Sequence, residues 1–176
     1  MKQMHRQTTP GQSGFTLLEV LIALLVLSIG LLGLAALQTT GLRSNQMASM
    51  RTTATQLAYD ITDRMRANLQ AVSDTANKPY VIAHDAAAPT VTTDCTTSNC
   101  TPAELATFDL AQWKTTLASS QNGLPGGRGD ITQTAGPPLV HTITVRWDQD
   151  RTGATGLRCP PEDETDLRCF RLIFSE

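Results

Sequence analysis

The most constraining feature of the chain is an apolar run from Phe15 to Leu37 that contains a single charged residue, Glu19. A run of this length can cross a bilayer, which takes roughly 20 apolar residues in a helix. A carboxylate in such a segment costs about 2.5–3.5 kcal/mol near the helix centre, and less near an interface. The run therefore predicts a membrane helix whose acidic residue, close to the helix start, has a use.

The junction before this run narrows the interpretation. Gly14 precedes Phe15, and the seven residues from Gly14 to Val20 read GFTLLEV. This segment resembles the signal of type IV prepilins and pseudopilins. The resemblance implies that a prepilin peptidase cuts between Gly14 and Phe15 on the cytoplasmic side and then methylates the new amino group of Phe15. Residues 1–14, which are polar and mildly basic, would be a leader peptide with no fold of its own.

Two ordinary targeting signals are the alternatives. A plain signal anchor would also have Lys2 and Arg6 before the apolar stretch, by the positive-inside rule. A secretory signal would need an apolar region of about 7–15 residues and a small-residue cleavage site. The segment Gly33-Leu34-Ala35 matches such a site only weakly, and the apolar run is too long. Neither alternative explains a Gly-Phe junction followed by Glu19.

Beyond Leu37 the apolar residues take a helical period, which predicts an amphipathic helix over residues 38–72. No proline occurs between Phe15 and Val72, so both halves are expected to form one helix. The half over 15–37 would lie in the membrane or against other subunits, and the second half would pack on the chain's own head. The residues expected on the packed face are Leu42, Met47, Met50, Ala54, Leu57, Ile61, Met65, Leu69 and Val72.

The stretch from Ala58 to Asn68, AYDITDRMRAN, closes this helix. Asp60 and Arg64 are four residues apart and are predicted to pair, for about 0.2–0.5 kcal/mol. Arg64 and Arg66 suit the negative end of the helix dipole. From the residues alone this is a solvated helix face. The stretch also resembles the end of the first helix in the type IV pilus modification proteins (PilV), a family of minor pilins.

Four cysteines, Cys95, Cys100, Cys159 and Cys169, lie beyond the membrane segment. An even number in an exported domain favours two disulfides. Three pairings exist, and the simplest joins near neighbours, Cys95 with Cys100 and Cys159 with Cys169. A zinc site with four cysteine ligands is the alternative, although the spacings C-x4-C and C-x9-C fit the usual knuckles poorly. A head of roughly 100 residues has a thin core that covalent links would support.

The head, residues 73–176, is expected to contain one helix and a small antiparallel sheet. Residues 73–100 are rich in Ala, Thr, Asp and Asn and predict an irregular region. The sequence Thr101-Pro102-Ala103-Glu104 predicts a capped helix start, and apolar residues continue a helix to about Ala118. The segment Gly123-Leu124-Pro125-Gly126-Gly127 breaks the chain, and this turn after a tryptophan-bearing helix also resembles PilV heads. Strands are expected at 130–135, 139–147 and 168–174, with an acidic loop over 148–167.

No catalytic or cofactor motif is recognisable, so neither enzyme activity nor a cofactor is expected. The histidines His5, His84 and His141 are isolated, and the glycines after Ala118 lack the ending of a phosphate loop. The tripeptide Arg128-Gly129-Asp130 is of integrin type, but a turn is the plainer interpretation. The net charge of −2 gives no basic field for nucleic acid. Calcium binding is considered for one acidic group, but this group lacks the alternating pattern of a calcium loop. Its members are Glu162, Asp163, Glu164 and Asp166.

Together these features predict an α+β fold of the type IV pilin kind, in which a long N-terminal helix packs on a small antiparallel sheet. The resemblance implies a minor pilin that is stored in the inner membrane with its head in the periplasm. It would then enter a type IV pilus and act in assembly and priming, with roles in twitching motility and adhesion. The implied partners are the prepilin peptidase, other minor and major pilins, the inner membrane and the pilus assembly platform, with Glu19 acting in subunit assembly.

One departure and two rival functions follow from the same residues. Many major pilins carry a proline in the membrane helix, where this chain has Leu34-Ala35-Ala36-Leu37, and this favours a minor subunit. A minor pseudopilin of a type II secretion system would share the signal and the head, and flanking genes would separate the two. A plain membrane-anchored binding domain would keep its N-terminus uncut and would tolerate the loss of Glu19.

Overall fold

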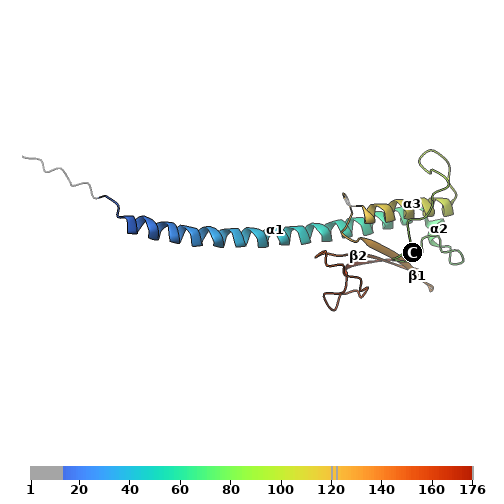
Figure 1. The fold of residues 1–176 in the computed structure, drawn as a ribbon. Coiled ribbons are helices and arrows are strands. Elements are labelled where there is room, and N and C mark those ends of the chain that lie inside the picture. Colours follow the sequence, from blue (N-terminus) through green and yellow to red (C-terminus); the bar gives the residue numbers. More distant parts are fainter. Residues whose placement is uncertain (1–13, 120, 122, 176) are drawn as a thin grey trace, which may run out of the picture. The chain divides into compact units, whose positions relative to one another are not determined.

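The computed structural model describes residues 14–119, 121 and 123–175. The leader proposed for residues 1–14 lies outside the described residues, except for Gly14. The chain divides into two compact units, Met1–Ser44 and Asn45–Glu176. Its elements, in order, are α1 (Leu17–Ala67), α2 (Leu69–Val72), α3 (Pro102–Ala118), β1 (Arg128–Thr134), β2 (Val140–Trp147) and β3 (Arg168–Ser175) (Figure 1). This confirms the predicted α+β fold, with a long N-terminal helix and a small three-stranded antiparallel sheet.

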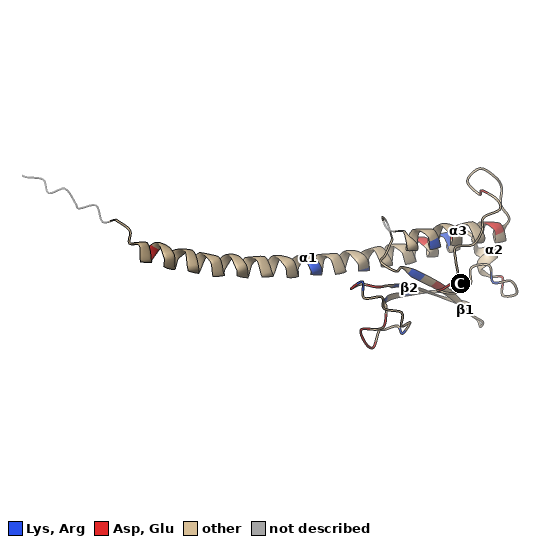
Figure 2. Ribbon diagram, in the orientation of Figure 1, with Lys and Arg blue, Asp and Glu red and all other residues tan. Residues whose placement is uncertain are grey.

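The first unit contributes only the N-terminal part of α1. Its 18-residue stretch of highest hydropathy averages 2.9 and has no buried share, so the helix is long and apolar enough to cross a membrane. Figure 2 shows this part of α1 as almost entirely uncharged. Its hydroxyl groups donate to carbonyls of their own helix, as Thr39 and Thr40 do to Ala36 at 2.8 and 3.1 Å. Satisfied hydroxyls of this kind are compatible with a lipid environment.

The first helix ends earlier than the sequence predicted. It stops at Ala67, and a single residue, Asn68, separates it from the short helix α2. The Asn68 amide Nδ2 donates to the Tyr80 hydroxyl at 3.2 Å and to the Pro102 carbonyl at 2.8 Å. These contacts with distant parts of the head hold Asn68 outside helical geometry, with φ −126° and ψ 53°. The expectation of one unbroken helix to Val72 is therefore wrong.

The sheet has the order β1-β2-β3, and both pairs of strands are antiparallel. Ile143 in the central strand is opposite Ile131 of β1 and Leu172 of β3. Along β2, the side chains of His141, Ile143, Val145 and Trp147 are buried, as alternation predicts for one face. Thr144 and Arg146 point to the opposite face of β2 and are also buried. The loop after β2 contacts this face, where Arg146 Nε donates to the Leu157 carbonyl at 3.2 Å. The strand ends differ from the expected ranges by at most two residues.

The core lies between the head part of α1, helix α3 and the sheet. Of the stripe predicted on the first helix, Met50, Ala54, Leu57, Ile61, Met65 and Val72 are buried. Leu42 and Leu69 are 70% and 47% exposed, so these two are wrong as core positions. Leu42 precedes the head unit, and Leu69 follows the turn at Asn68, which changes the direction of the helical face. Two further buried side chains, Tyr80 and Trp113, complete the core contact with α1.

Helix α3 begins as predicted. Thr101 is its N-cap, Pro102 is its first residue, and Glu104 completes a capping box. The helix is fixed to α1 by the Trp113 indole, whose Nε1 donates to the Leu57 carbonyl at 2.9 Å. A close contact follows on β1, where a Cβ on Gly129 would lie 2.4 Å from a ring carbon of Trp113. Glycine at this position therefore lets the strand approach the tryptophan ring.

Candidate functional site

The start of α1 holds the residues predicted for processing and assembly. Gly14 and Phe15 precede the helix, and Phe15 is 84% exposed. The Glu19 amide N–H donates to the Thr16 carbonyl at 3.1 Å and lies 3.3 Å from the Thr16 hydroxyl oxygen, so Thr16 caps the helix. Glu19 thus lies in the first turn with its side chain exposed. A carboxylate at this position interacts favourably with the positive end of the helix dipole.

Packing within the chain does not explain the glycines of this unit. A Cβ built on Gly14, Gly30 or Gly33 would meet nothing within 4 Å. The same segment exposes large apolar side chains, among them Leu32 and Leu37, each 71% exposed. Exposed apolar surface of this extent marks a segment that contacts lipid or other proteins. The glycines and the apolar side chains are therefore available for contacts outside the chain.

At the far end of α1, Arg64 connects the helix to the rest of the head. Its guanidinium binds Asp60 at 3.1 Å, as the sequence predicted, and also Asp109 of α3 at 3.3 Å. Asp109 is buried and accepts a hydrogen bond from the Tyr80 hydroxyl at 2.7 Å. Burial, and then the contact with Asp109, raise the pKa of Tyr80. The interpretation of this stretch as a simple solvated face is wrong at Arg64, because its guanidinium also binds a buried carboxylate of α3.

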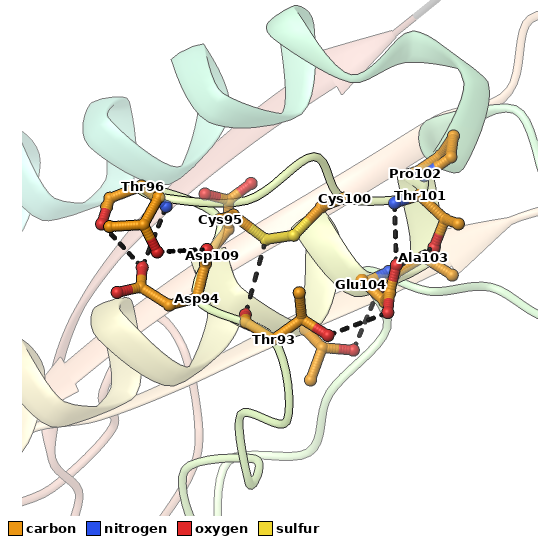
Figure 3. Close-up of a disulfide and its surroundings, with 12 residues drawn as sticks. Thr93, Asp94, Cys95, Thr96, Cys100, Thr101, Pro102, Ala103, Glu104 and Asp109 are labelled. Carbon is orange, nitrogen blue, oxygen red and sulfur yellow. Dashed lines mark hydrogen bonds between the residues drawn. A yellow bond between two sulfur atoms is a disulfide. The ribbon is translucent and has the colours of Figure 1, made fainter.

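The two disulfides in the structure are the local pairs, Cys95–Cys100 and Cys159–Cys169. Figure 3 shows the first one beside the capped start of α3. There the Glu104 carboxylate accepts hydrogen bonds from the Thr101 backbone N–H at 2.8 Å and from the Thr93 hydroxyl at 3.0 Å. These bonds lower the pKa of Glu104. The disulfide and the capping box thus hold the irregular region before α3 against the helix start.

The second disulfide joins the acidic loop to β3. Three of the four carboxylates in the predicted acidic group share one cation within this loop, because the Arg158 guanidinium pairs with Glu162, with Asp163 at 2.7 Å and with Asp166 at 2.9 Å. Glu164 has no ion pair with a described residue. Among the described residues, no group of three or more His, Cys, Asp or Glu side chains is arranged to hold a metal ion. The loop is therefore an internally paired structure attached to the sheet.

We expect the second disulfide to contribute more to stability than the first. Losing a native disulfide typically costs about 2–5 kcal/mol, and the chain-entropy term grows with the length of the closed loop. The Cys159–Cys169 loop spans 10 residues and the Cys95–Cys100 loop spans 5. Paired Cys→Ser variants of the full chain in non-ionic detergent, compared by thermal unfolding, should show the larger loss for Cys159 and Cys169. Equal stability of both variants and the parent chain would contradict this expectation.

The sequence analysis predicted no role for Lys114 or Arg146 and named Asp130 only within a tripeptide, yet all three are buried in the head. Lys114 of α3 donates from Nζ to the carbonyls of Ala83, His84 and Gly129, each at 3.1 Å, and burial lowers its pKa. Asp130 and Arg146 form an ion pair on the sheet, and both are at most 9% exposed. The tripeptide at 128–130 is therefore part of β1, and the turn expected there is wrong. Lys114 lies among apolar residues on one face of α3, and this position is the sequence signal that indicates its burial.

Two family models match the chain. Residues 9–35 match the prokaryotic N-terminal methylation motif, and residues 36–111 match type IV pilin Tt1218. No curated protein and no solved structure matches the chain. The first 27 matched residues are thus similar to a methylation motif and the next 76 to a type IV pilin, and the sheet over 128–175 lies beyond both matches.

Proposed function

We propose that the chain is a minor pilin of a type IV pilus, similar to the type IV pilus modification proteins (PilV), and that it acts in pilus assembly and priming. The observation that carries this proposal is the start of α1, where the sequence GFTLLEV leads into an exposed apolar helix. The methylation motif matched over residues 9–35 supports processing by a prepilin peptidase between Gly14 and Phe15. The pilin domain matched over residues 36–111 supports assembly with other pilins.

The apolar part of α1 gives the chain two successive environments. From Leu17 to Leu37 the helix is about 30 Å long at 1.5 Å per residue, which equals the hydrocarbon thickness of a bilayer. Before assembly this segment would anchor the chain in the inner membrane with its head in the periplasm. After assembly the same exposed surface would pack against helices of other subunits, where Gly30 and Gly33 permit close approach.

The disulfides support an exported head. Disulfides form and persist in oxidising compartments such as the periplasm and are rare in the cytosol. Both bonds lie in the second unit, beyond the apolar segment. A single-pass orientation with a cytoplasmic leader and a periplasmic head agrees with both observations. It places the basic residues Lys2 and Arg6 on the cytoplasmic side and the disulfides in the oxidising periplasm. The partners in this proposal are the prepilin peptidase, the other pilins and the assembly platform.

The proposal predicts cleavage and methylation at one bond. Intact-mass and N-terminal analysis of the membrane-extracted protein should show a chain that begins with methylated Phe15. Gly14→Val should abolish cleavage, because a side chain next to the scissile bond obstructs the peptidase. The substitution should not disturb the chain's own fold, since a Cβ on Gly14 would meet nothing within 4 Å. Gly30→Val is the matched control and should be processed normally.

The proposal would be overturned by finding Met1 retained in a chain that is incorporated in functional pili. It would also be overturned if Gly14→Val and Gly30→Val were processed equally well. A chain that is cleaved and methylated but copurifies with secretion-system components, and never with pili, would show that the processing is right and the pilus assignment is wrong.

A further inference from the structure

A groove of about 370 Å³ opens on the head between α1, the end of β2, β3 and the loop before β3. The disulfide Cys159–Cys169 holds one side of this groove, because it attaches Pro160 and Pro161 to β3. Trp147 and Arg168 are opposite each other in the sheet and lie at the groove together. The residues that line it are Arg51, Trp147, Gln149, Cys159, Pro160, Pro161, Arg168, Cys169 and Arg171.

The charge of this groove is one-sided. Arg51, Arg168 and Arg171 are exposed, and no aspartate or glutamate is among the residues that line it. Among the described residues, none of these three guanidinium groups has an ion pair, whereas the neighbouring Arg158 has three carboxylate partners. Three cations in one groove without a counter-charge repel one another, and a bound anion would relieve that repulsion.

A second observation at the same place is independent of the arginines. Trp147 is 3% exposed, and its indole Nε1–H has no hydrogen-bond acceptor among the described residues. Buried polar groups nearly always have a partner, because an unmade bond in the interior destabilises the fold. The other tryptophan, Trp113, is equally buried, and its Nε1 donates to a backbone carbonyl. Nε1 itself has almost no accessible surface, so Trp147 lies at the groove as a buried indole with an unpaired N–H, and the exposed donors there are the three arginines.

We propose that this groove binds a phosphomonoester carried on a small sugar, a binding activity additional to pilus assembly. A phosphomonoester carries a charge of about −1.5 to −2 at neutral pH and three strong acceptor oxygens. Arginine side chains bind such groups through two parallel N–H donors. A carboxylate would offer two oxygens and a single charge, which leaves more of the groove's positive charge uncompensated.

The remaining lining fits a hydroxylated carrier. Gln149 supplies an amide that both donates and accepts hydrogen bonds, which suits sugar hydroxyls. Pro160 and Pro161 supply apolar surface on the other side, where a sugar ring can pack. Ligand pockets are typically about 300–1,000 Å³, and a groove near the lower limit holds a phosphate and one ring rather than a long chain.

The two tryptophans make a direct test possible. The full chain, labelled with ¹⁵N and held in non-ionic detergent micelles, should give two indole signals, which Trp147→Phe assigns. Titration with glucose 6-phosphate should shift the Trp147 signal saturably and leave the Trp113 signal in place. Inorganic phosphate should shift the same signal more weakly, because it lacks the ring, and glucose or sodium chloride at equal ionic strength should not shift it.

Arginine variants test the charged part of the groove. Arg51→Gln, Arg168→Gln and Arg171→Gln should each weaken binding of glucose 6-phosphate by about tenfold or more, since bonds to charged groups are worth more than about 1.4 kcal/mol, or tenfold. Arg66→Gln is the matched control, because Arg66 lies on the same helix, pairs with Asp63 at 3.0 Å and is not among the groove residues. Its affinity should equal that of the parent chain.

Three outcomes would overturn the proposal. They are no saturable shift of the Trp147 signal, equal shifts of both tryptophan signals, and groove variants that bind as tightly as Arg66→Gln. Binding of inorganic phosphate without any gain from glucose 6-phosphate would overturn the sugar carrier. None of these results depends on whether the chain enters a pilus, so the test is separate from that of the proposed function.

Discussion

Replacing Asp130 with alanine is expected to lower the unfolding free energy of the head by about 3–5 kcal/mol, because the change leaves the Arg146 cation buried without its partner. Arg146 and Asp130 are 8% and 9% exposed, so water cannot replace the lost carboxylate. The remaining bond of Arg146, from Nε to the Leu157 carbonyl at 3.2 Å, supplies an acceptor but no charge. The loss should lower the melting temperature by more than about 12 °C in a domain of this size.

Thermal unfolding of the full chain in non-ionic detergent measures this effect, with the near-ultraviolet signal of the two buried tryptophans as a probe of the head. Asp63→Ala is the matched control, because the Arg66–Asp63 pair is exposed and such pairs are worth about 0–1 kcal/mol. The double variant Asp130→Ala/Arg146→Met should be more stable than Asp130→Ala alone, since no unpaired charge remains. A loss at Asp130 no larger than that at Asp63 would show that the pair is not buried.

Elements with a local signal could be predicted from the sequence. Helix α3 is the clearest case, because Thr101, Pro102 and Glu104 make their capping contacts within the first turn, and these contacts need nothing from the rest of the fold. The central and last strands were predicted because apolar and polar residues alternate along them. The start of α1 followed from its length, its hydropathy and the Gly14–Phe15 junction. In each case the residues that carry the signal lie close together in the chain, within the element that they predict.

Features that depend on distant partners could not be predicted in this way. No local pattern indicates that Asn68 will bind Tyr80 and Pro102, and these bonds occur at the break between α1 and α2. The sequence analysis made no prediction for Lys114, whose ammonium group is held by three carbonyls from two other segments. The binding groove belongs to the same class, since its arginines come from α1 and β3, more than a hundred residues apart.

Glu19, which is exposed in the single chain, has the largest expected effect on assembly. Cleavage after Gly14 would free a cationic amine at Phe15, one helical turn before the carboxylate. Among parallel helices in a low-dielectric interior, the amine of one subunit can meet Glu19 of its neighbour, and pairing removes most of the cost of burying either charge. The pair would attract the subunits and fix their axial register. In the single chain, Glu19 is exposed and its backbone is already capped by Thr16, so its own fold does not require the carboxylate.

Glu19→Ala should therefore leave membrane insertion and cleavage nearly intact, while incorporation into pili falls about tenfold or more, since an unpaired charge in the membrane costs about 2.5–3.5 kcal/mol. Ser28→Ala is the matched control in the same apolar segment, because the Ser28 hydroxyl donates to the Leu24 carbonyl of its own helix and has no need of a partner subunit. Quantitative mass spectrometry of sheared pili, with the cleaved membrane pool as reference, measures the ratio. Normal incorporation of cleaved Glu19→Ala would mean that Glu19 only complements the dipole of its own helix.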